Sequence, residues 1–322
     1  MSEETLLEVK NLKVHFSKKK MFKEAVTVHA VDGVSFSVPK GKTFGIVGES
    51  GSGKTTTALG VLRLVPITDG QVILKGTDIT SLEKEELRQE RRHFQMVFQD
   101  PYSSLDPRRR VGEIVREPLD LMEIGDEADR DEAVRELFVQ VGLRPELTNL
   151  FPHQFSGGQR QRVGLARALA TKPDLIVCDE PVSALDVAVQ AQILNLMRKL
   201  QEKMGVTYLF ISHDLGVVQH LCDHVAVMYL GQIVEQADRV SLFKNPKHPY
   251  TKALLSAVPK VSAIGKDEKR IHLQGDPPSP INLPKGCRFA GRCPVAMDKC
   301  HKIPPALIDT GASHLAACHL IA

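Results

Sequence analysis

A run of eight residues, Gly48, Glu49, Ser50, Gly51, Ser52, Gly53, Lys54 and Thr55, fits the phosphate-binding pattern G-x-x-x-x-G-K-[ST]. An apolar run over 43–47 precedes it and a helical pattern beginning at Thr56 follows, which is the strand–loop–helix context that this motif requires. In such a loop, backbone N–H groups and a helix N-terminus face the phosphates of a nucleotide. We expect Lys54 to reach the outer phosphates, Thr55 to bind Mg²⁺ and Thr56 to border the site. The loop predicts binding of a nucleoside triphosphate.

Two adjacent carboxylates follow a second apolar run, which spans Leu175–Cys178. Asp179 could hold Mg²⁺, and Glu180 could act as general base on the water that attacks the γ-phosphate. An Asp-Glu pair at a strand end could also be a solvated turn. Its place downstream of a phosphate loop favours the catalytic interpretation.

Further polar residues follow the same arrangement. Gln99 comes after the apolar run 96–98, and its amide could contact Mg²⁺ and the attacking water; His213 comes after the run 208–212, and its imidazole could hydrogen-bond the γ-phosphate. Alone, either residue is more typical of a structural role. A fourth segment, consisting of Ser156, Gly157, Gly158 and Gln159, opens a helical pattern. Serine is a preferred N-cap and the glycines allow close approach, so this segment predicts a second phosphate contact.

The elements that would position these residues alternate between apolar strands and helical patterns over roughly the first 240 residues. This alternation predicts an α/β fold with a mostly parallel sheet flanked by helices. We expect strands at 6–14, 31–38, 43–47, 72–74, 94–98, 175–178, 208–212 and 224–229. Helical patterns at 127–142 and 158–170, with no strand between them, predict an inserted helical subdomain over about 100–168. Turn-rich sequence then predicts a boundary between a domain at 1–245 and a small irregular extension at 246–322.

The composition sets outer limits on function. A hydrophobic content of 42% and a charged content of 25% are ordinary for a globular protein. The net charge of +3 is too small to argue for a nucleic-acid partner. No stretch approaches the ~18 apolar residues of a membrane span, and the first residues predict no signal peptide. We therefore expect a cytoplasmic protein, or one that reaches a membrane through other chains.

Taken in order, the phosphate loop, Gln99, 156–159, 179–180, 183–186 and His213 resemble the nucleotide-binding subunit of an ATP-binding cassette (ABC) transporter, over roughly residues 5–322. The resemblance implies a P-loop NTPase (ABC ATPase) core, with ATP and Mg²⁺ as its ligands. It also implies that two subunits face head to tail, so that each phosphate loop meets the other chain's Ser156–Gln159 segment. An aromatic side chain would stack on adenine; Phe16 matches this position best, and Phe22 and His29 are alternatives.

Segments 98–107, 245–251 and 275–280 further resemble the ATPases of oligopeptide and dipeptide importers. This resemblance implies ATP-driven peptide uptake at the cytoplasmic face of the membrane. The implied partners are two transmembrane permease subunits, contacted by the helical region with Gln99, a second related ATPase subunit and, indirectly, an extracytoplasmic peptide-binding protein. The same tail occurs on importers of nickel complexes, sugars and opine-like compounds, which remain alternatives, as does a soluble ABC ATPase outside transport.

Four cysteines, Cys287, Cys293, Cys300 and Cys318, gather near the C-terminus, while Cys178 and Cys222 lie in apolar or helical contexts. The spacing of the four C-terminal cysteines, C-x5-C-x6-C-x17-C, lacks the C-x2-C pair of zinc fingers. Four thiolates could hold a [4Fe–4S] cluster or a zinc ion, or they could remain free thiols. The resemblance to the importer tail favours the [4Fe–4S] cluster. The neighbouring His301, His314 and His319 are not expected to be ligands.

Overall fold

The computed structural model describes residues 4–20, 23–100, 102, 104–258 and 271–321. The chain divides into two compact units, each built from segments that are distant in the sequence. The first contains Met1–Leu7, Val38–Lys42 and Leu74–Ile211, and the second contains Glu8–Ser37, Thr43–Ile73 and Ser212–Ala322. No helix in the described ranges is long and apolar enough to cross a lipid bilayer.

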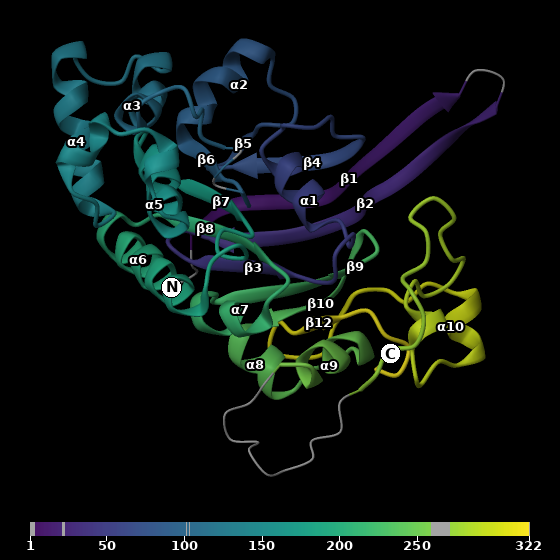
Figure 1. The fold of residues 1–322 in the computed structure, drawn as a ribbon. Helices are drawn as coiled ribbons and strands as arrows, with labels where there is room; N and C mark the ends of the chain where they lie inside the picture. The colour runs from purple at the N-terminus through teal and green to yellow at the C-terminus, as the bar shows by residue number, and fades with distance from the viewer. Residues whose placement is uncertain (1–3, 21–22, 101, 103, 259–270, 322) are drawn as a thin grey trace, which may run out of the picture. The chain divides into compact units, whose positions relative to one another are not determined.

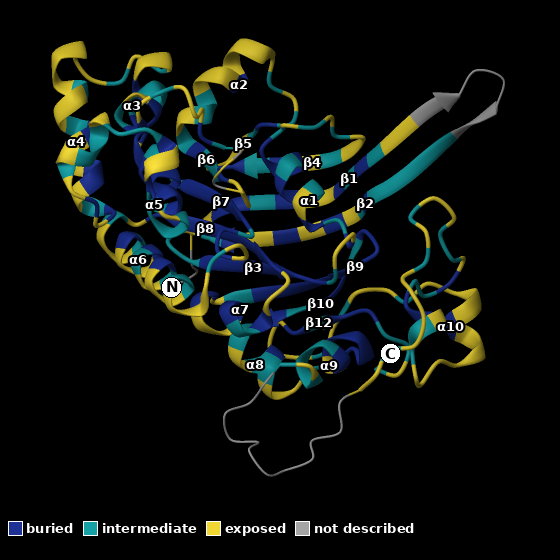
Figure 2. Cartoon of the chain, viewed as in Figure 1, coloured by how far each residue is buried: buried dark blue, intermediate teal, exposed yellow. Residues whose placement is uncertain are grey.

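Three parallel strands form the sheet of the first unit. β6 (Phe94–Val97) pairs with β7 (Leu175–Asp179), and β7 pairs with β8 (Thr207–Ser212). Every residue of β7 and β8 is buried, as expected for parallel strands covered on both faces (Figure 2). Because the strands are parallel, their carboxyl ends share one edge of the sheet.

Helices occupy most of the chain between β6 and β7 (Figure 1). α3 (Val111–Leu121), α4 (Arg130–Gln140) and α5 (Gly157–Leu169) contact one another, and no strand separates them in the described part of this region. The sequence predicted α4 and α5 but not α3, whose interior Pro118 and alternating charges obscure the helical period. The unit also contains β5 (Thr77–Asp78), α2 (Lys84–Glu90), α6 (Val187–Met204) and 3-10 turns at Arg91–His93, Glu127–Asp129, Pro145–Asn149 and Pro152–Gln154.

The second unit contains parts of two sheets. In one, β1 (Thr5–Lys20) lies between β2 (Lys23–Pro39) and β4 (Asp69–Leu74). In the other, β3 (Thr43–Val47) pairs in parallel with β9 (His224–Tyr229), and β10 (Gln232–Asp238) continues the sheet antiparallel to β9. Both β1 and β2 are longer than predicted, because they continue through polar residues that end the apolar pattern.

The C-terminal extension adds an antiparallel edge to this second sheet. β12 (Leu315–Ala316) pairs with β10, and β11 (Ile308–Asp309) pairs with β12. The sequence predicts an irregular extension and no strand here, because strands of two residues carry no detectable alternation. The helices of the unit are α1 (Lys54–Val61), α7 (Leu215–Leu221), α8 (Arg239–Lys244), α9 (Pro249–Ser256) and α10 (Asp298–Lys302), with a 3-10 turn at Ala290–Arg292.

Candidate nucleotide site and thiol pocket

The phosphate loop joins the buried strand β3 to helix α1 through backbone that approaches its neighbours closely. A Cβ on Gly48 would lie 2.2 Å from the Met228 carbonyl oxygen. A Cβ on Gly53, whose φ is 104°, would lie 2.2 Å from the Ala30 carbonyl oxygen. Any side chain at these positions would displace backbone, so the loop presents main-chain groups instead. This is the surface that a phosphate requires.

Lys54 is the first residue of α1 and is 5% exposed. Its Nζ donates to the carbonyl oxygens of Gly48 at 2.9 Å and Glu49 at 3.0 Å, so the ammonium group spans the loop. No side chain caps the N-terminus of α1, which leaves that end of the helix suited to an anion. Thr55, the expected Mg²⁺ ligand, is exposed beside it.

In the first unit, the expected general base lies against the expected water-positioning amide. Gln99 Nε2 donates to Glu180 Oε2 at 2.9 Å. Glu180 has a φ of 46°, and its backbone is fixed by its N–H donating to Ile211 O at 2.9 Å and by Ser183 Oγ donating to its carbonyl oxygen at 3.0 Å. A non-glycine residue held in the left-handed region is a sign of functional constraint. Asp179, at the end of β7, is 4% exposed.

The segment Ser156–Gln159 forms a reciprocal N-cap at the start of α5. The Gln159 N–H donates to Ser156 Oγ at 3.3 Å, and the Ser156 N–H donates to Gln159 Oε1 at 2.9 Å. The predicted N-cap role of Ser156 is confirmed. A Cβ on Gly158 would lie 2.5 Å from Val189 Cγ1 in α6, so only glycine allows this packing.

The loop after Gln99 contacts the same helix. The Arg160 guanidinium lies 3.6 Å from the centroid of the Tyr102 ring, and Arg160 Nε donates to Pro152 O at 2.7 Å. Arg167 Nη1 donates to Ser104 O at 2.6 Å, and burial lowers the pKa of Arg167. The Gln99 loop and α5 are therefore one connected structure. Pro101 and Ser103 of the same loop lie outside the described residues.

The candidate adenine platform is in the second unit. Phe16, on β1, is 43% exposed, so its ring is available to a base. His29 packs edge-on against His15 with 4.4 Å between ring centroids, and Phe22 lies outside the described residues. His213 is exposed and directly follows β8. The roles of Phe16 and His213 stay predictions.

The four C-terminal cysteines line one pocket, as the clustering in the sequence suggested. Cys287, Cys293, Cys300 and Cys318 surround it together with Phe289 and His319, and its cavity volume is about 10 Å³. Burial raises the pKa of the Cys287, Cys293 and Cys318 thiols. Cys178 and Cys222 are buried elsewhere, as predicted. His314 instead contacts Glu235 at 2.7 Å.

In the described residues, one group of three His, Cys, Asp or Glu side chains has ligand atoms within 4.8 Å of one another, and it contains no cysteine. Zinc with Zn–S bonds of about 2.3 Å would hold four sulfur atoms about 3.8 Å apart. No three of the pocket thiols lie within 4.8 Å of one another, so in the described residues they are not in the arrangement of a bound zinc ion.

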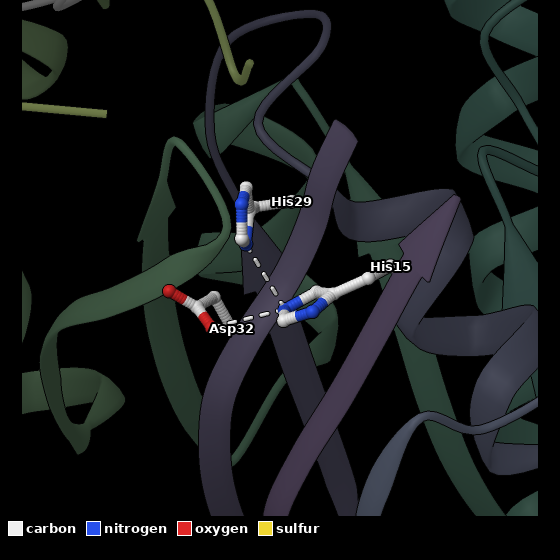
Figure 3. Close-up of side chains that lie close together, drawn as sticks. All are labelled: His15, His29 and Asp32. Carbon is white, nitrogen blue, oxygen red and sulfur yellow. Dashed lines mark hydrogen bonds and ion pairs between the residues drawn. The ribbon is translucent and has the colours of Figure 1, made fainter. Parts of the chain in front are cut away.

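The group of three is His15, His29 and Asp32 (Figure 3). His15 Nε2 lies 3.0 Å from Asp32 Oδ1 and 3.3 Å from His29 Nδ1. Burial favours a higher pKa for Asp32, but hydrogen bonds and charge from Arg288 and His15 outweigh it and lower the pKa. Because the Arg288 guanidinium already neutralises Asp32, we interpret the group as a polar network rather than a metal centre.

Two arginines that the sequence did not single out contact the nucleotide-site elements of the second unit. Arg292 forms a bidentate ion pair with Glu49 of the phosphate loop, with Nη1–Oε2 at 2.6 Å and Nη2–Oε1 at 3.1 Å. Arg288 pairs with Asp32 and donates to Leu230 O at 2.6 Å. Their only signal in the sequence is that both lie between Cys287 and Cys293, a segment assigned above to the tail alone.

Two family models match the chain. Residues 31–183 match the model described as ABC transporter, and residues 234–300 match the model described as oligopeptide/dipeptide transporter, C-terminal region. The chain is 50% identical over 323 residues to the oligopeptide transport ATP-binding protein AppF of Bacillus subtilis, covering 99% of this chain and 98% of that protein. It is 49% identical over 318 residues to a putative peptide import ATP-binding protein of Brucella ovis, with coverage of 99% and 98%.

Solved structures with the same fold include the dimeric ATP-binding cassette MJ0796 bound to ADP and Pi. This structure has a TM-score of 0.65 and 30% identity, and the match covers 73% of this chain and 99% of that one. CbiO1 from Clostridium perfringens, part of the transporter complex cbiONQ, has a TM-score of 0.66 and 25% identity, with coverage of 76% and 92%.

Proposed function

The chain belongs to the ABC transporter family of ATP-binding subunits, and from this premise we propose that it hydrolyses ATP to power the uptake of di- or oligopeptides through a membrane importer. The α/β ABC ATPase fold predicted from the motifs is confirmed. One observation carries the proposal of a peptide cargo. The region 234–300 matches the C-terminal region of oligopeptide and dipeptide transporters, and it follows a phosphate loop with no degenerate position.

The residues divide the chemistry of hydrolysis among themselves. Lys54 and the N-terminus of α1 would bind the phosphates, and Thr55, Asp179 and Gln99 would hold Mg²⁺, which would neutralise charge on the phosphates. Glu180 accepts a proton from the water whose oxygen attacks the γ-phosphorus, and the bond from that phosphorus to the bridging oxygen breaks, releasing ADP and phosphate. His213 orients the water from the γ-phosphate side. The Gln99–Glu180 hydrogen bond supports the assignment of base and water-positioning amide.

The partners follow from the same assignment. Two transmembrane permease subunits would change conformation when ATP binds to this chain. The chain would lie peripherally at the cytoplasmic face of the membrane. Exposed Phe98 and Tyr102, at 40% and 64%, flank Gln99 and offer apolar contact to a permease helix. A second, related ATPase would supply its own Ser-Gly-Gly-Gln segment to the phosphate loop, and an extracytoplasmic peptide-binding protein would deliver cargo.

The extension contributes a cofactor site and a domain of its own. Cys287, Cys293, Cys300 and Cys318 line one pocket, and the resemblance of the extension to the importer tail supports a [4Fe–4S] cluster there, with zinc as the alternative. Bound there, the cluster would supply a covalent link among chain segments rather than redox catalysis. We propose a domain boundary at 245/246 and a helical subdomain at about 100–168; a separate family model matches the chain from residue 234 to 300.

The test is peptide uptake by cells that carry this chain, or its Glu180→Gln variant, as their only copy. Glutamine keeps the shape and the hydrogen-bonding amide partner but cannot accept the proton, so uptake of labelled di- and oligopeptides is expected to disappear while ATP binding persists. Uptake that continues with the variant contradicts the proposal of peptide transport. If the variant instead loses uptake of a nickel complex or a sugar, the cargo is reassigned and the ATPase role is kept.

A further inference from the structure

The segment Cys287–Cys293 joins the thiol pocket to the nucleotide site of the second unit. Its two end residues line the thiol pocket. Between them, Arg288 and Arg292 point away to β2 and to the phosphate loop, where they meet Asp32 and Glu49. Seven consecutive residues therefore carry both thiols and both contacts.

The contact at the phosphate end is strong by its geometry. The Arg292 side chain is 9% exposed and its two terminal nitrogens meet both oxygens of Glu49. The hydrogen bond to Glu49 raises the pKa of Arg292. A bidentate pair between an arginine and a carboxylate is among the stronger charge-assisted hydrogen bonds. The Glu49 N–H also donates to Tyr250 Oη at 2.9 Å, and Tyr250 packs on Phe289 with 5.3 Å between ring centroids.

Glu49 is placed to transmit this constraint, because its carbonyl oxygen accepts from Lys54 Nζ. The residue that would bind the outer phosphates is thus hydrogen-bonded to the same residue whose side chain Arg292 holds. A phosphate loop fixed before the nucleotide arrives loses less conformational freedom on binding.

The second contact reaches the other end of the candidate site. Arg288 pairs with Asp32. Asp32 contacts His15 (Figure 3), and His15 directly precedes the adenine candidate Phe16 in the chain. The His29 N–H donates to Pro280 O at 3.0 Å, so β2 is held by the extension at a further point.

We propose that Arg292 is a positioning residue for the phosphate loop and Arg288 for the adenine platform. Through the segment Cys287–Cys293, the loss of a thiol from the pocket would then lower the affinity for ATP. The inference rests on the proposed function only in taking ATP as the ligand of the phosphate loop. It assigns the extension a role in nucleotide binding that is separate from the transported cargo.

The test compares two probes on the full chain, MgATP and magnesium tripolyphosphate, which lacks the base and ribose. Arg292→Ala is expected to lower the affinity for both probes about tenfold, which is the scale of one charge-assisted hydrogen-bond pair. Arg288→Ala is expected to weaken MgATP alone. Lys302→Ala removes an exposed cation from the same extension and should change neither dissociation constant. Equal losses for both probes in Arg288→Ala would overturn the adenine assignment.

A double-mutant cycle separates positioning from general loss of fold. Glu49→Ala is expected to raise the Kd for MgATP as much as Arg292→Ala does. The double variant is expected to have the same Kd as either single variant. Cys293→Ser should lower the affinity for MgATP in the wild-type background. Combined with Arg292→Ala, it should lower that affinity no further. MgATP affinity unchanged by Arg292→Ala would overturn the inference while leaving the ATPase intact. If the wild-type chain binds neither probe, the proposed function itself fails.

Discussion

The amide of Gln99 donates a 2.9 Å hydrogen bond to the carboxylate of Glu180, although 81 positions separate the two residues. The register of the sheet accounts for this meeting. Val97 and Cys178 are paired across β6 and β7, so the residues that follow the two strands emerge at one edge. The hydrogen bond fixes the direction of the carboxylate that we assign as general base.

Gln99→Ala should therefore lower turnover more than binding. Without the amide, Glu180 keeps its charge but loses its orientation toward the attacking water, and a misplaced base costs on the order of 10- to 100-fold in kcat. The Kd for MgATP should change less than kcat, since the phosphate loop still binds the phosphates and Thr55 and Asp179 remain as Mg²⁺ ligands. Steady-state ATPase assays with a parallel nucleotide-binding titration measure both. A large loss of affinity with unchanged kcat would show that Gln99 acts on binding instead.

The glycine at position 53 should be irreplaceable for two separable reasons. Gly53→Ala places a Cβ 2.2 Å from the Ala30 carbonyl oxygen and also strains a φ of 104°. Gly41→Ala is the matched control, because Gly41 has a φ of 71° but nothing within 4 Å of the added Cβ. Strain alone costs about 1–2 kcal/mol. The control should lose about that much free energy of unfolding and keep nucleotide binding, whereas Gly53→Ala should lose binding as well. Equal behaviour of the two variants would refute the close-approach argument.

The sequence predicted the parts of the site that rest on local pattern. The phosphate loop needs a strand, a turn and a helix in succession, and β3, Gly53 and α1 are adjacent in the chain. The N-cap at Ser156 was equally readable, because Gln159 lies three positions later.

Contacts at long range left no such signal. Arg292 meets Glu49 across 243 positions, and nothing in the local sequence distinguishes this arginine from a solvated one. Helix α3 was missed because Pro118 breaks its pattern, although packing against α4 and α5 stabilises it. The left-handed φ of Glu180 was also unforeseen, since glutamate has no intrinsic preference for that region.

Asp174 should contribute stability that depends on pH. Its carboxylate contacts Lys75 Nζ at 2.9 Å and His93 Nδ1 at 2.8 Å. Burial favours a higher pKa, but the hydrogen bonds and charges of Lys75 and His93 outweigh it, so the pKa lies below the ordinary 3.8. Because the folded-state pKa is depressed, the unfolded state binds more protons, and the stabilisation is present above pH 3.8 and disappears as pH falls through the folded value.

Asp174→Asn should accordingly lower the free energy of unfolding by about 1 kcal/mol near neutral pH, a value discounted for partial exposure. Urea unfolding of both proteins at about pH 7 and in steps below about pH 4 checks this. The difference between the curves should shrink as the wild-type carboxylate protonates. A difference that stays constant across the series would mean that the carboxylate's charge is not the source.

Removal of any one pocket thiol should release the proposed cofactor. Serine for cysteine at position 287, 293, 300 or 318 removes a thiolate ligand, and a four-iron cluster needs all four. The chain purified without oxygen should contain four iron and four sulfide ions, with broad visible absorption, and each variant should lose both. Cys222→Ser is the control, because Cys222 is buried beside Gly45 rather than in the pocket.

Loss of the cofactor should also raise the rate of proteolysis within residues 271–321, since the pocket then lacks the link among its segments. Limited digestion of the wild-type chain and the four serine variants, followed by mass spectrometry of the fragments, measures this rate. One zinc ion per chain in place of iron would contradict the [4Fe–4S] assignment in favour of zinc. A chain with neither metal would contradict the cofactor assignment and leave four thiols in an apolar pocket.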